Sequence, residues 1–212
     1  MSAVTPFRLG VLGSGRGSNF VAIADAIAAG KIPAEISLVL SDVETAGILV
    51  EARSRQLAAR YIAPGKFRTR LEDGIEQEYV ATLRDAGANF IVLAGFMRVL
   101  KDPFLRAFPD RIVNIHPSLL PAFPGLAAWQ QALDYGVKIT GCTVHFVTAG
   151  VDTGAIIGQQ SVAVLDTDTA ATLHARIQAA EHELYPRCLA ALARDEITRI
   201  GRRVVPRTSS VN

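Results

Sequence analysis

The stretch FRLGVLGSGRGSNFVAIADAIAAG, residues 7–30, decides the fold class. It begins with a short apolar run, passes through a glycine-rich turn, and continues with apolar residues at helical spacing as far as Gly30. A buried strand, a glycine-rich turn and a helix in this order are typical of the first half of a βαβ unit. We expect Ser18 to be the N-cap of the helix and Gly30 to follow its last turn.

The alternation of short apolar runs and longer helical patterns continues along the first half of the chain. Further strands are predicted at residues 35–42, 59–63, 89–95 and 111–116. Helices are predicted between them, at residues 45–56 and from about 68 to 86. Continuous apolar strands separated by helices indicate a parallel sheet that is covered on both faces.

The alternation of apolar runs and helical patterns ends after residue 116. Three prolines within residues 117–124 predict a stiff loop without regular structure, because proline fixes φ and lacks a backbone donor. Residues 139–150 and 154–165 read as two long strands with a short connector, which favours an antiparallel pair. The remaining helices are predicted at residues 126–135 and from about 169 to 195. The predicted fold is a single α/β, Rossmann-like domain. Its mostly parallel twisted sheet is extended by antiparallel strands in the C-terminal half, with helices on both faces.

The composition excludes several classes of protein. Half of the 212 residues are hydrophobic and 20% are charged, so the chain is not intrinsically disordered. A net charge of +2 gives no basis for a general nucleic-acid or membrane-surface binder, and no apolar run approaches the length of a membrane-spanning helix. The N-terminal residues lack the pattern of a signal peptide, and Cys142 and Cys188 are expected to be buried free thiols. A cytoplasmic protein is therefore predicted.

The C-terminal residues form the one basic segment. Residues 196–212 contain Glu196 and four arginines, which are Arg199, Arg202, Arg203 and Arg207. We expect residues 199–212 to be a flexible, solvated basic tail and residues 1–198 to form the single domain.

The glycine-rich turn predicts an anion site. Gly13, Gly15 and Gly17 allow close approach of backbone N–H groups to a ligand, and Ser18 and Asn19 follow at the start of the helix. A single phosphate is the favoured guest of such a helix N-terminus. Two alternatives stay open: a turn that only permits tight packing, and a dinucleotide site in which Asp42 would bind a ribose.

Polar side chains at the end of the 111–116 strand predict the catalytic site. Asn114 and His116 point to one face of the strand, next to the proline-rich loop, and can together stabilise a developing oxyanion. Asp152 is the candidate partner of His116. His145 is either a group that supports the site or a packed core residue. The remaining candidates lie on the last helix, where Glu181 could reach the site, whereas His174 and His182 are predicted at the surface.

Together these segments resemble one protein family. The turn Gly-Ser-Asn at 17–19, NFIVLAGFMRVL, RIVNIHPSLLPAFPG, TVHFVTAGVDTG and AAEHELYP are similar to the phosphoribosylglycinamide formyltransferase family. The resemblance extends from about Leu9 to about Ala193. It implies a folate-dependent enzyme of purine biosynthesis that uses 10-formyltetrahydrofolate and glycinamide ribonucleotide, without a metal ion. The predicted partners are these small molecules, with no nucleic acid or membrane, and the chain would be a monomer or a homodimer.

The resemblance also implies roles for single residues. Gly17, Ser18 and Asn19 would hold the substrate phosphate, Glu181 would contact the ribonucleotide, and Asn114, His116 and Asp152 would be catalytic. Asn114 would also contact the folate, which the family binds through a basic residue at Arg70 and through Met97, Arg98, Val99 and Leu100. The chain departs from the family at Ala127, Ala128 and Trp129, a stretch in which the family usually carries His or Asp and a second His.

The mechanism implied by the resemblance is direct formyl transfer to the ribonucleotide amine. Asn114 and protonated His116 would hydrogen-bond the formyl oxygen, and Asp152 would stabilise the charged imidazole. Two other functions stay open. In a formyltetrahydrofolate hydrolase, water replaces the amine. A nucleotide-binding module would use the glycine turn and Asp42 without any chemistry.

Overall fold

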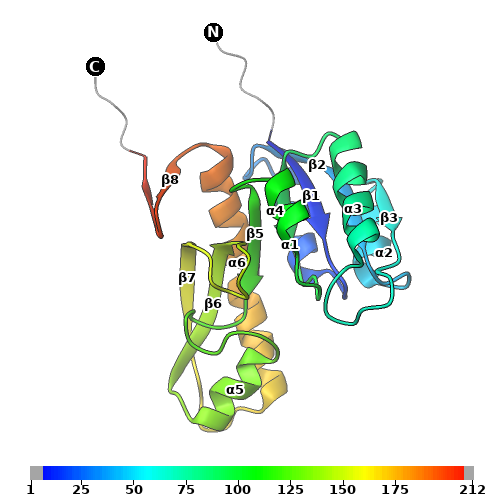
Figure 1. The fold of residues 1–212 in the computed structure, drawn as a ribbon. Helices are drawn as coiled ribbons and strands as arrows, with labels where there is room; N and C mark the ends of the chain where they lie inside the picture. The colour runs from blue at the N-terminus through cyan, green and yellow to red at the C-terminus, as the bar shows by residue number, and fades with distance from the viewer. Residues whose placement is uncertain (1–6, 208–212) are drawn as a thin grey trace, which may run out of the picture.

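The computed structural model describes residues 7–207 and contains a seven-stranded sheet (Figure 1). The strands are β1 (Phe7–Leu12), β2 (Ala34–Ser41), β3 (Ala59–Tyr61), β4 (Phe90–Leu93), β5 (Ile112–His116), β6 (Ile139–Phe146) and β7 (Ile156–Ala163). Their order in the sheet is β3-β2-β1-β4-β5-β6-β7. The first five strands of that order pair in parallel, whereas β6 pairs antiparallel with both β5 and β7. The predicted sheet is therefore confirmed.

Helices cover both faces of this sheet (Figure 1). Buried residues of α1 (Ser18–Ala28), α2 (Gly47–Ser54) and α6 (Ala170–Ala193) form one core cluster with the strands. Buried residues of α3 (Asp73–Asp85) and α4 (Asp102–Ala107) form a second cluster on the other face. The short helix α5 (Ala128–Tyr135) packs on α6.

Three local predictions differ from the structure. Ser18 is not the N-cap of α1, because that position belongs to Gly17 in the left-handed region, and no side chain caps the helix. The third helix begins at Asp73 and not near residue 68, because Arg70 forms a β-bridge with Val99 and is held in extended backbone. Helix α4 was not expected. Its six residues are too few for a helical period to stand out, although Asp102 and a proline mark its start.

The prediction of a flexible tail from residue 199 is wrong for most of that segment. Strands β8 (Ile197–Ile200) and β9 (Arg203–Pro206) form an antiparallel hairpin. Val204 packs against the core cluster, and Arg199 pairs with Asp110 and lies over the ring of Phe146. Residues 208–212 of the predicted tail lie outside the described residues. The hairpin thus joins the main body of the fold.

One expectation about residues outside the site, the state of the two cysteines, can be compared with the fold. Cys142 and Cys188 are buried free thiols, as predicted, and burial raises the pKa of each thiol to about 12. None of the helices within residues 7–207 combines the length and apolar character needed to cross a membrane. In the same residues, no group of three or more His, Cys, Asp or Glu side chains is placed to hold a metal ion.

Candidate active site

A cavity of about 250 Å³ opens where parallel strands β4 and β5 end. Open α/β sheets bind their ligands outside the carboxyl ends of the strands, so its position fits a ligand site. Four stretches of chain contribute to its wall, within residues 93–100, 114–117, 125–129 and 145–152. Asn114, His116 and Asp152 all line this cavity, which confirms that the predicted catalytic residues lie together.

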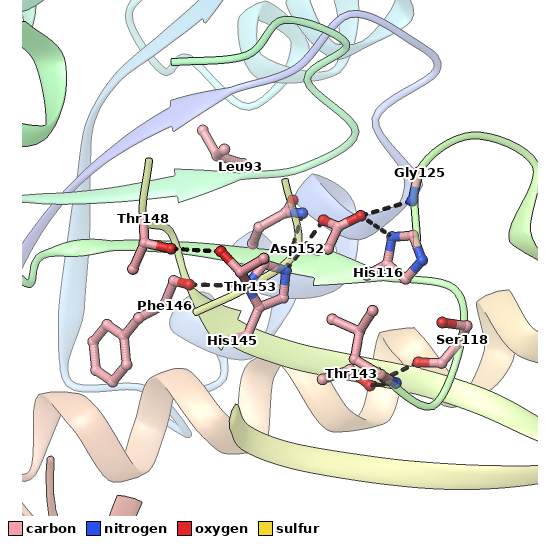
Figure 2. A network of polar contacts seen from close by, with 12 residues as sticks. Leu93, His116, Ser118, Gly125, Thr143, His145, Phe146, Thr148, Asp152 and Thr153 are labelled. Atoms are coloured by element: carbon pink, nitrogen blue, oxygen red, sulfur yellow. Dashed lines mark hydrogen bonds and ion pairs between the residues drawn. The ribbon is translucent and has the colours of Figure 1, made fainter. Parts of the chain in front are cut away.

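Asp152 lies between two histidine rings, as Figure 2 shows. Its Oδ2 is 3.3 Å from Nδ1 of His116, and its Oδ1 is 3.6 Å from Nε2 of His145. The backbone N–H of Gly125 also donates to Oδ2, at 2.9 Å. Asp152 itself has a positive φ of 52°, a conformation that a turn aspartate tolerates better than most residues. The β6–β7 connection thus holds this carboxylate against the end of β5.

Both ring nitrogens of His116 face acceptors. Nδ1 faces the Asp152 carboxylate, and Nε2 is 2.8 Å from the carbonyl oxygen of Phe123 in the proline-rich loop. A carbonyl and a carboxylate only accept hydrogen bonds, so the doubly protonated imidazolium satisfies both contacts at once. His116 is 4% exposed, and little water competes for it. Its Nε2 can reach a ligand in the cavity once the contact with Phe123 is released.

His145 contacts both Asp152 and Asn114. Of its two predicted roles, a group that supports the site or a packed core residue, these contacts favour the first. Its ring is buried, and burial lowers the pKa of the imidazole below its usual value, so the neutral form is favoured. Nδ1 lies 2.9 Å from the carbonyl of Phe146 and must therefore carry the proton. The lone pair of Nε2 then faces the Asn114 amide at 3.5 Å. His145 is thus placed to orient the Asn114 side chain.

The glycine-rich turn leaves the first N–H groups of α1 without a side-chain cap. Gly17 has a φ of 86°, and a Cβ there would lie 2.8 Å from Cα of Ile48. Glycine is therefore required both by conformation and by space. Uncapped N–H groups at a helix N-terminus attract an anion, so the turn keeps the properties predicted for a phosphate site.

Asn19 and Glu181 meet beside this turn. Nδ2 of Asn19 donates to Oε2 of Glu181 at 2.8 Å, across 162 residues of sequence. Oδ1 of the same amide is buried and has no hydrogen-bond partner among the described residues. Glu181 is 5% exposed, and burial raises its pKa to about 7, while the bond from Asn19 partly offsets the rise. Glu181, predicted to reach the catalytic site, thus lies next to the glycine-rich turn, and it does not line the cavity.

The predicted folate-binding residues divide into two groups. Met97, Arg98, Val99 and Leu100 all line the cavity. The guanidinium of Arg98 is bonded to Asp42, with Nε 2.6 Å from its carboxylate. Arg70 does not line the cavity; it forms a backbone bridge with Val99 and stacks on the ring of Phe67 at 3.7 Å.

Asp42 cannot serve as predicted for a dinucleotide site without breaking its contacts. Its side chain is buried, and it accepts hydrogen bonds from Arg98 and from Ser14 Oγ. Each carboxylate oxygen already has a partner, and exposing the group to a ribose would leave the Arg98 guanidinium without its counter-charge. The nucleotide-binding alternative therefore loses its ribose-binding residue.

Trp129 is one of the three residues at which the sequence departs from the family pattern. Its indole lines the cavity and stacks on His174 of α6, with ring centroids 3.7 Å apart and an interplanar angle of 5°. The predictions for His174 and His182 need correction, because both rings are half-buried and not at the surface. No pattern in the sequence pairs Trp129 with a residue 45 positions away.

This stack predicts a fluorescence signal, because Trp129 is the chain's single tryptophan. Burial and the nearby Arg16 lower the pKa of His174 below its usual 6.5, so the imidazole stays neutral until the pH falls further. A stacked imidazolium quenches indole emission more strongly than neutral imidazole does. We expect emission to drop with a midpoint below pH 6.5 in the natural protein. It should not drop in His174→Phe, which keeps a stacked ring. A transition of equal size in that variant would contradict the assignment.

Comparison with known proteins gives one consistent family. The model of the formyl transferase family matches residues 7–189 of this chain. The phosphoribosylglycinamide formyltransferase of Mycobacterium tuberculosis is 44% identical over 202 residues, which cover 93% of this chain and 90% of that protein. The trifunctional purine biosynthetic protein adenosine-3 of Drosophila pseudoobscura pseudoobscura is 46% identical over 198 residues, 92% of this chain. This chain spans only 14% of the length of that protein.

A solved structure agrees in fold as well as in sequence. The glycinamide ribonucleotide transformylase 1 of Symbiobacterium toebii superposes with a TM-score of 0.91 at 46% identity. The match covers 95% of this chain and 94% of that one. The similarity thus includes the sheet, the cavity segments and α6.

Proposed function

This chain belongs to the formyl transferase family, and from that membership we propose that it transfers a formyl group from 10-formyltetrahydrofolate to the amine of glycinamide ribonucleotide, in purine biosynthesis. The observation that carries the proposal is the cluster of Asn114, His116 and Asp152 at one wall of the cavity. Acyl transfer needs donors aimed at the oxygen on which charge develops. An amide and a protonated imidazole provide them.

The trio accounts for the chemistry without a covalent enzyme intermediate. Asn114 and His116 would hydrogen-bond the formyl oxygen as the ribonucleotide amine attacks the formyl carbon. Asp152 would hold the imidazole of His116 in its charged form through the contact at Nδ1. As the carbon–nitrogen bond to folate breaks, a proton from the attacking amine would reach the leaving nitrogen through His116, Asp152 or an ordered water.

The two substrates would occupy neighbouring parts of one face. Met97, Val99, Leu100 and Asn114 line the cavity and would contact the folate. The N–H groups at Gly17, Ser18 and Asn19 would hold the ribonucleotide phosphate, since no side chain caps them. Glu181, bonded to Asn19, would contact the ribonucleotide beside its phosphate. Arg70 would act only at the edge of the cavity, through its bridge to Val99.

The test is a steady-state assay of tetrahydrofolate release with and without glycinamide ribonucleotide. The proposal requires release to depend on the ribonucleotide and to match the formylated ribonucleotide mole for mole. Release that is independent of the ribonucleotide would identify a formyltetrahydrofolate hydrolase. Binding of a dinucleotide without any folate turnover would favour the nucleotide-binding module.

Gly17→Ala is predicted to raise the KM for the ribonucleotide more than the KM for the folate. The added Cβ must approach Ile48 at 2.8 Å, and a φ of 86° is unfavourable for alanine, so the turn has to shift. We expect the KM for the ribonucleotide to rise about tenfold or more and the KM for the folate to rise much less. Gly15→Ala is the matched control, because a Cβ there would meet nothing within 4 Å. Equal rises in both KM values for Gly17→Ala would mean that the turn is only structural.

Residues 1–198 would form the catalytic domain, and the rest of the C-terminal hairpin packs against it through Val204. The protein would act as a monomer or a homodimer, and it would work in the cytoplasm. The small-molecule substrates proposed above would be its partners.

A further inference from the structure

Ser14 connects the two parts of the site that the substrates would occupy. Its hydroxyl donates to Oδ1 of Asp42 at 2.5 Å and accepts the backbone N–H of Met97 at 2.9 Å. Its own backbone N–H donates to the carbonyl of Gly95 at 3.0 Å. One residue of the glycine-rich turn is therefore bonded directly to the segment 95–100, which lines the cavity.

Arg98 extends this connection to a third segment. Its Nε is 2.6 Å from Oδ2 of Asp42, so the carboxylate holds Ser14 with one oxygen and Arg98 with the other. Nη1 of Arg98 donates to the carbonyls of Phe67 and Arg68. The result is a single hydrogen-bonded network from the turn, through the end of β2, to the loop before α3.

Burial makes the network stiff. The Asp42 side chain is 1% exposed and that of Arg98 14% exposed. Charged groups in such surroundings are costly to leave without partners, so a shift of one member must be followed by the others. The backbone on the far side is also fixed, because the N–H of Val99 donates to the carbonyl of Thr69 at 2.9 Å.

We propose that Ser14, with Asp42 and Arg98, is a positioning element that couples the phosphate turn to the folate-binding segment 97–100. A ligand in the turn shifts Ser14, and because the network moves as one unit, the N–H of Met97 and the backbone that follows it shift as well. The second substrate then meets a segment that is already in its binding position and binds more tightly. This inference rests on the proposed function, because it needs two ligands at these two places.

The test is the dissociation constant of tetrahydrofolate, measured by calorimetry with and without saturating glycinamide ribonucleotide. Tetrahydrofolate carries no formyl group, so no reaction disturbs the measurement. We expect the natural protein to bind it about fivefold or more tightly when the ribonucleotide is present, the lower end of typical coupling between sites. Ser14→Ala should bring this ratio close to one, and Asp42→Asn should lower it. Ser54→Ala is the control, because its hydroxyl bonds only the Glu51 carbonyl at the end of α2.

A purely structural role for Ser14 would weaken both ligands or lower the melting temperature while the ratio stayed at its natural value. That result would overturn the proposal, as would a ratio of one in the natural protein. Amide hydrogen exchange of the free protein gives a readout without ligands. Met97 should exchange faster in Ser14→Ala than in Ser54→Ala, and equal rates would contradict the network. If neither substrate bound the natural protein, the proposed function would fail, and the exchange comparison would still decide whether Ser14 holds the segment.

Discussion

His116→Ala is expected to lower kcat by about 10²–10³-fold, because it removes one of the two donors aimed at the developing oxyanion. A loss of this size corresponds to roughly 3–4 kcal/mol of transition-state stabilisation. The KM for either substrate should change little, since the phosphate turn and the 97–100 segment contact other residues. Pre-steady-state rates of formyl transfer give the chemical step directly.

Asp152→Asn is expected to cause a comparable loss for a different reason. Asparagine keeps the shape of the side chain and an oxygen that can accept the N–H of Gly125, so the loop contact survives. It removes the charge that stabilises the imidazolium of His116 across the 3.3 Å contact. The control is Asp166→Asn, which removes a carboxylate whose side chain is 88% exposed and pairs with Lys138. A kcat within threefold of the natural value in Asp152→Asn would exclude the carboxylate from the chemistry.

Glu181→Gln is expected to weaken ribonucleotide binding, and the size of this effect depends on pH. Burial raises the pKa of Glu181 to about 7, so the fraction of carboxylate grows as the pH rises through that value. A hydrogen bond to a charged group contributes roughly 1.5–3 kcal/mol. We therefore expect the variant to raise the KM for the ribonucleotide about 10- to 100-fold at pH 8 and much less at pH 6. Equal losses at both pH values would mean that the ionised carboxyl group does not bind substrate.

The same carboxyl group links stability to pH. The folded pKa of about 7 lies above the ordinary value of 4.5, so the native state keeps a proton that the unfolded chain loses. This stabilising contribution is complete below pH 4.5 and is lost as the pH rises through 7. Between these limits the natural protein should lose about 3 kcal/mol relative to Glu181→Gln, measured by urea unfolding. Glu183→Gln, on the exposed side of α6, is the control and should show no such trend.

The parallel part of the sheet could be predicted because burial on both faces makes its strands apolar throughout. Residues 89–95 and 111–116 illustrate this, since each contains a strand at the predicted place. The start of α3 could not be predicted in the same way. Residues 68–72 have helical composition, but the bridge between Arg70 and Val99, a contact across 29 positions, keeps them extended. Tertiary contacts override local propensity at such places.

The sequence of the C-terminal hairpin contains a strand–turn–strand pattern, although the segment is rich in arginine. ITRI and RVVP are two runs with β-branched residues on either side of Gly201-Arg202, a spacing typical of a tight hairpin. Charge alone suggested a solvated tail. The side chain of Val204, which packs against the core, stabilises the hairpin instead.

In the candidate site, too, contacts between residues close in sequence could be predicted, whereas contacts between distant segments could not. Asn114 and His116 are two positions apart on one strand, so period-two geometry places them together. The partnership with Asp152 could be predicted from its position between two strands. The orientation of Asn19 toward Glu181 and the bonds of Ser14 to Asp42 and Met97 could not, because each joins segments that are far apart in the sequence and meet only in the folded structure.

The most direct test of the proposed transfer follows the formyl carbon itself. The protein is mixed with 10-formyltetrahydrofolate labelled with ¹³C in the formyl group and with glycinamide ribonucleotide, and the products are observed by ¹³C NMR. Direct transfer predicts that all of the released label appears as the formamide carbon of the ribonucleotide, and that Asp152→Asn slows its appearance by the same factor as kcat. Label that appears as free formate, at a rate independent of the ribonucleotide, would contradict the account.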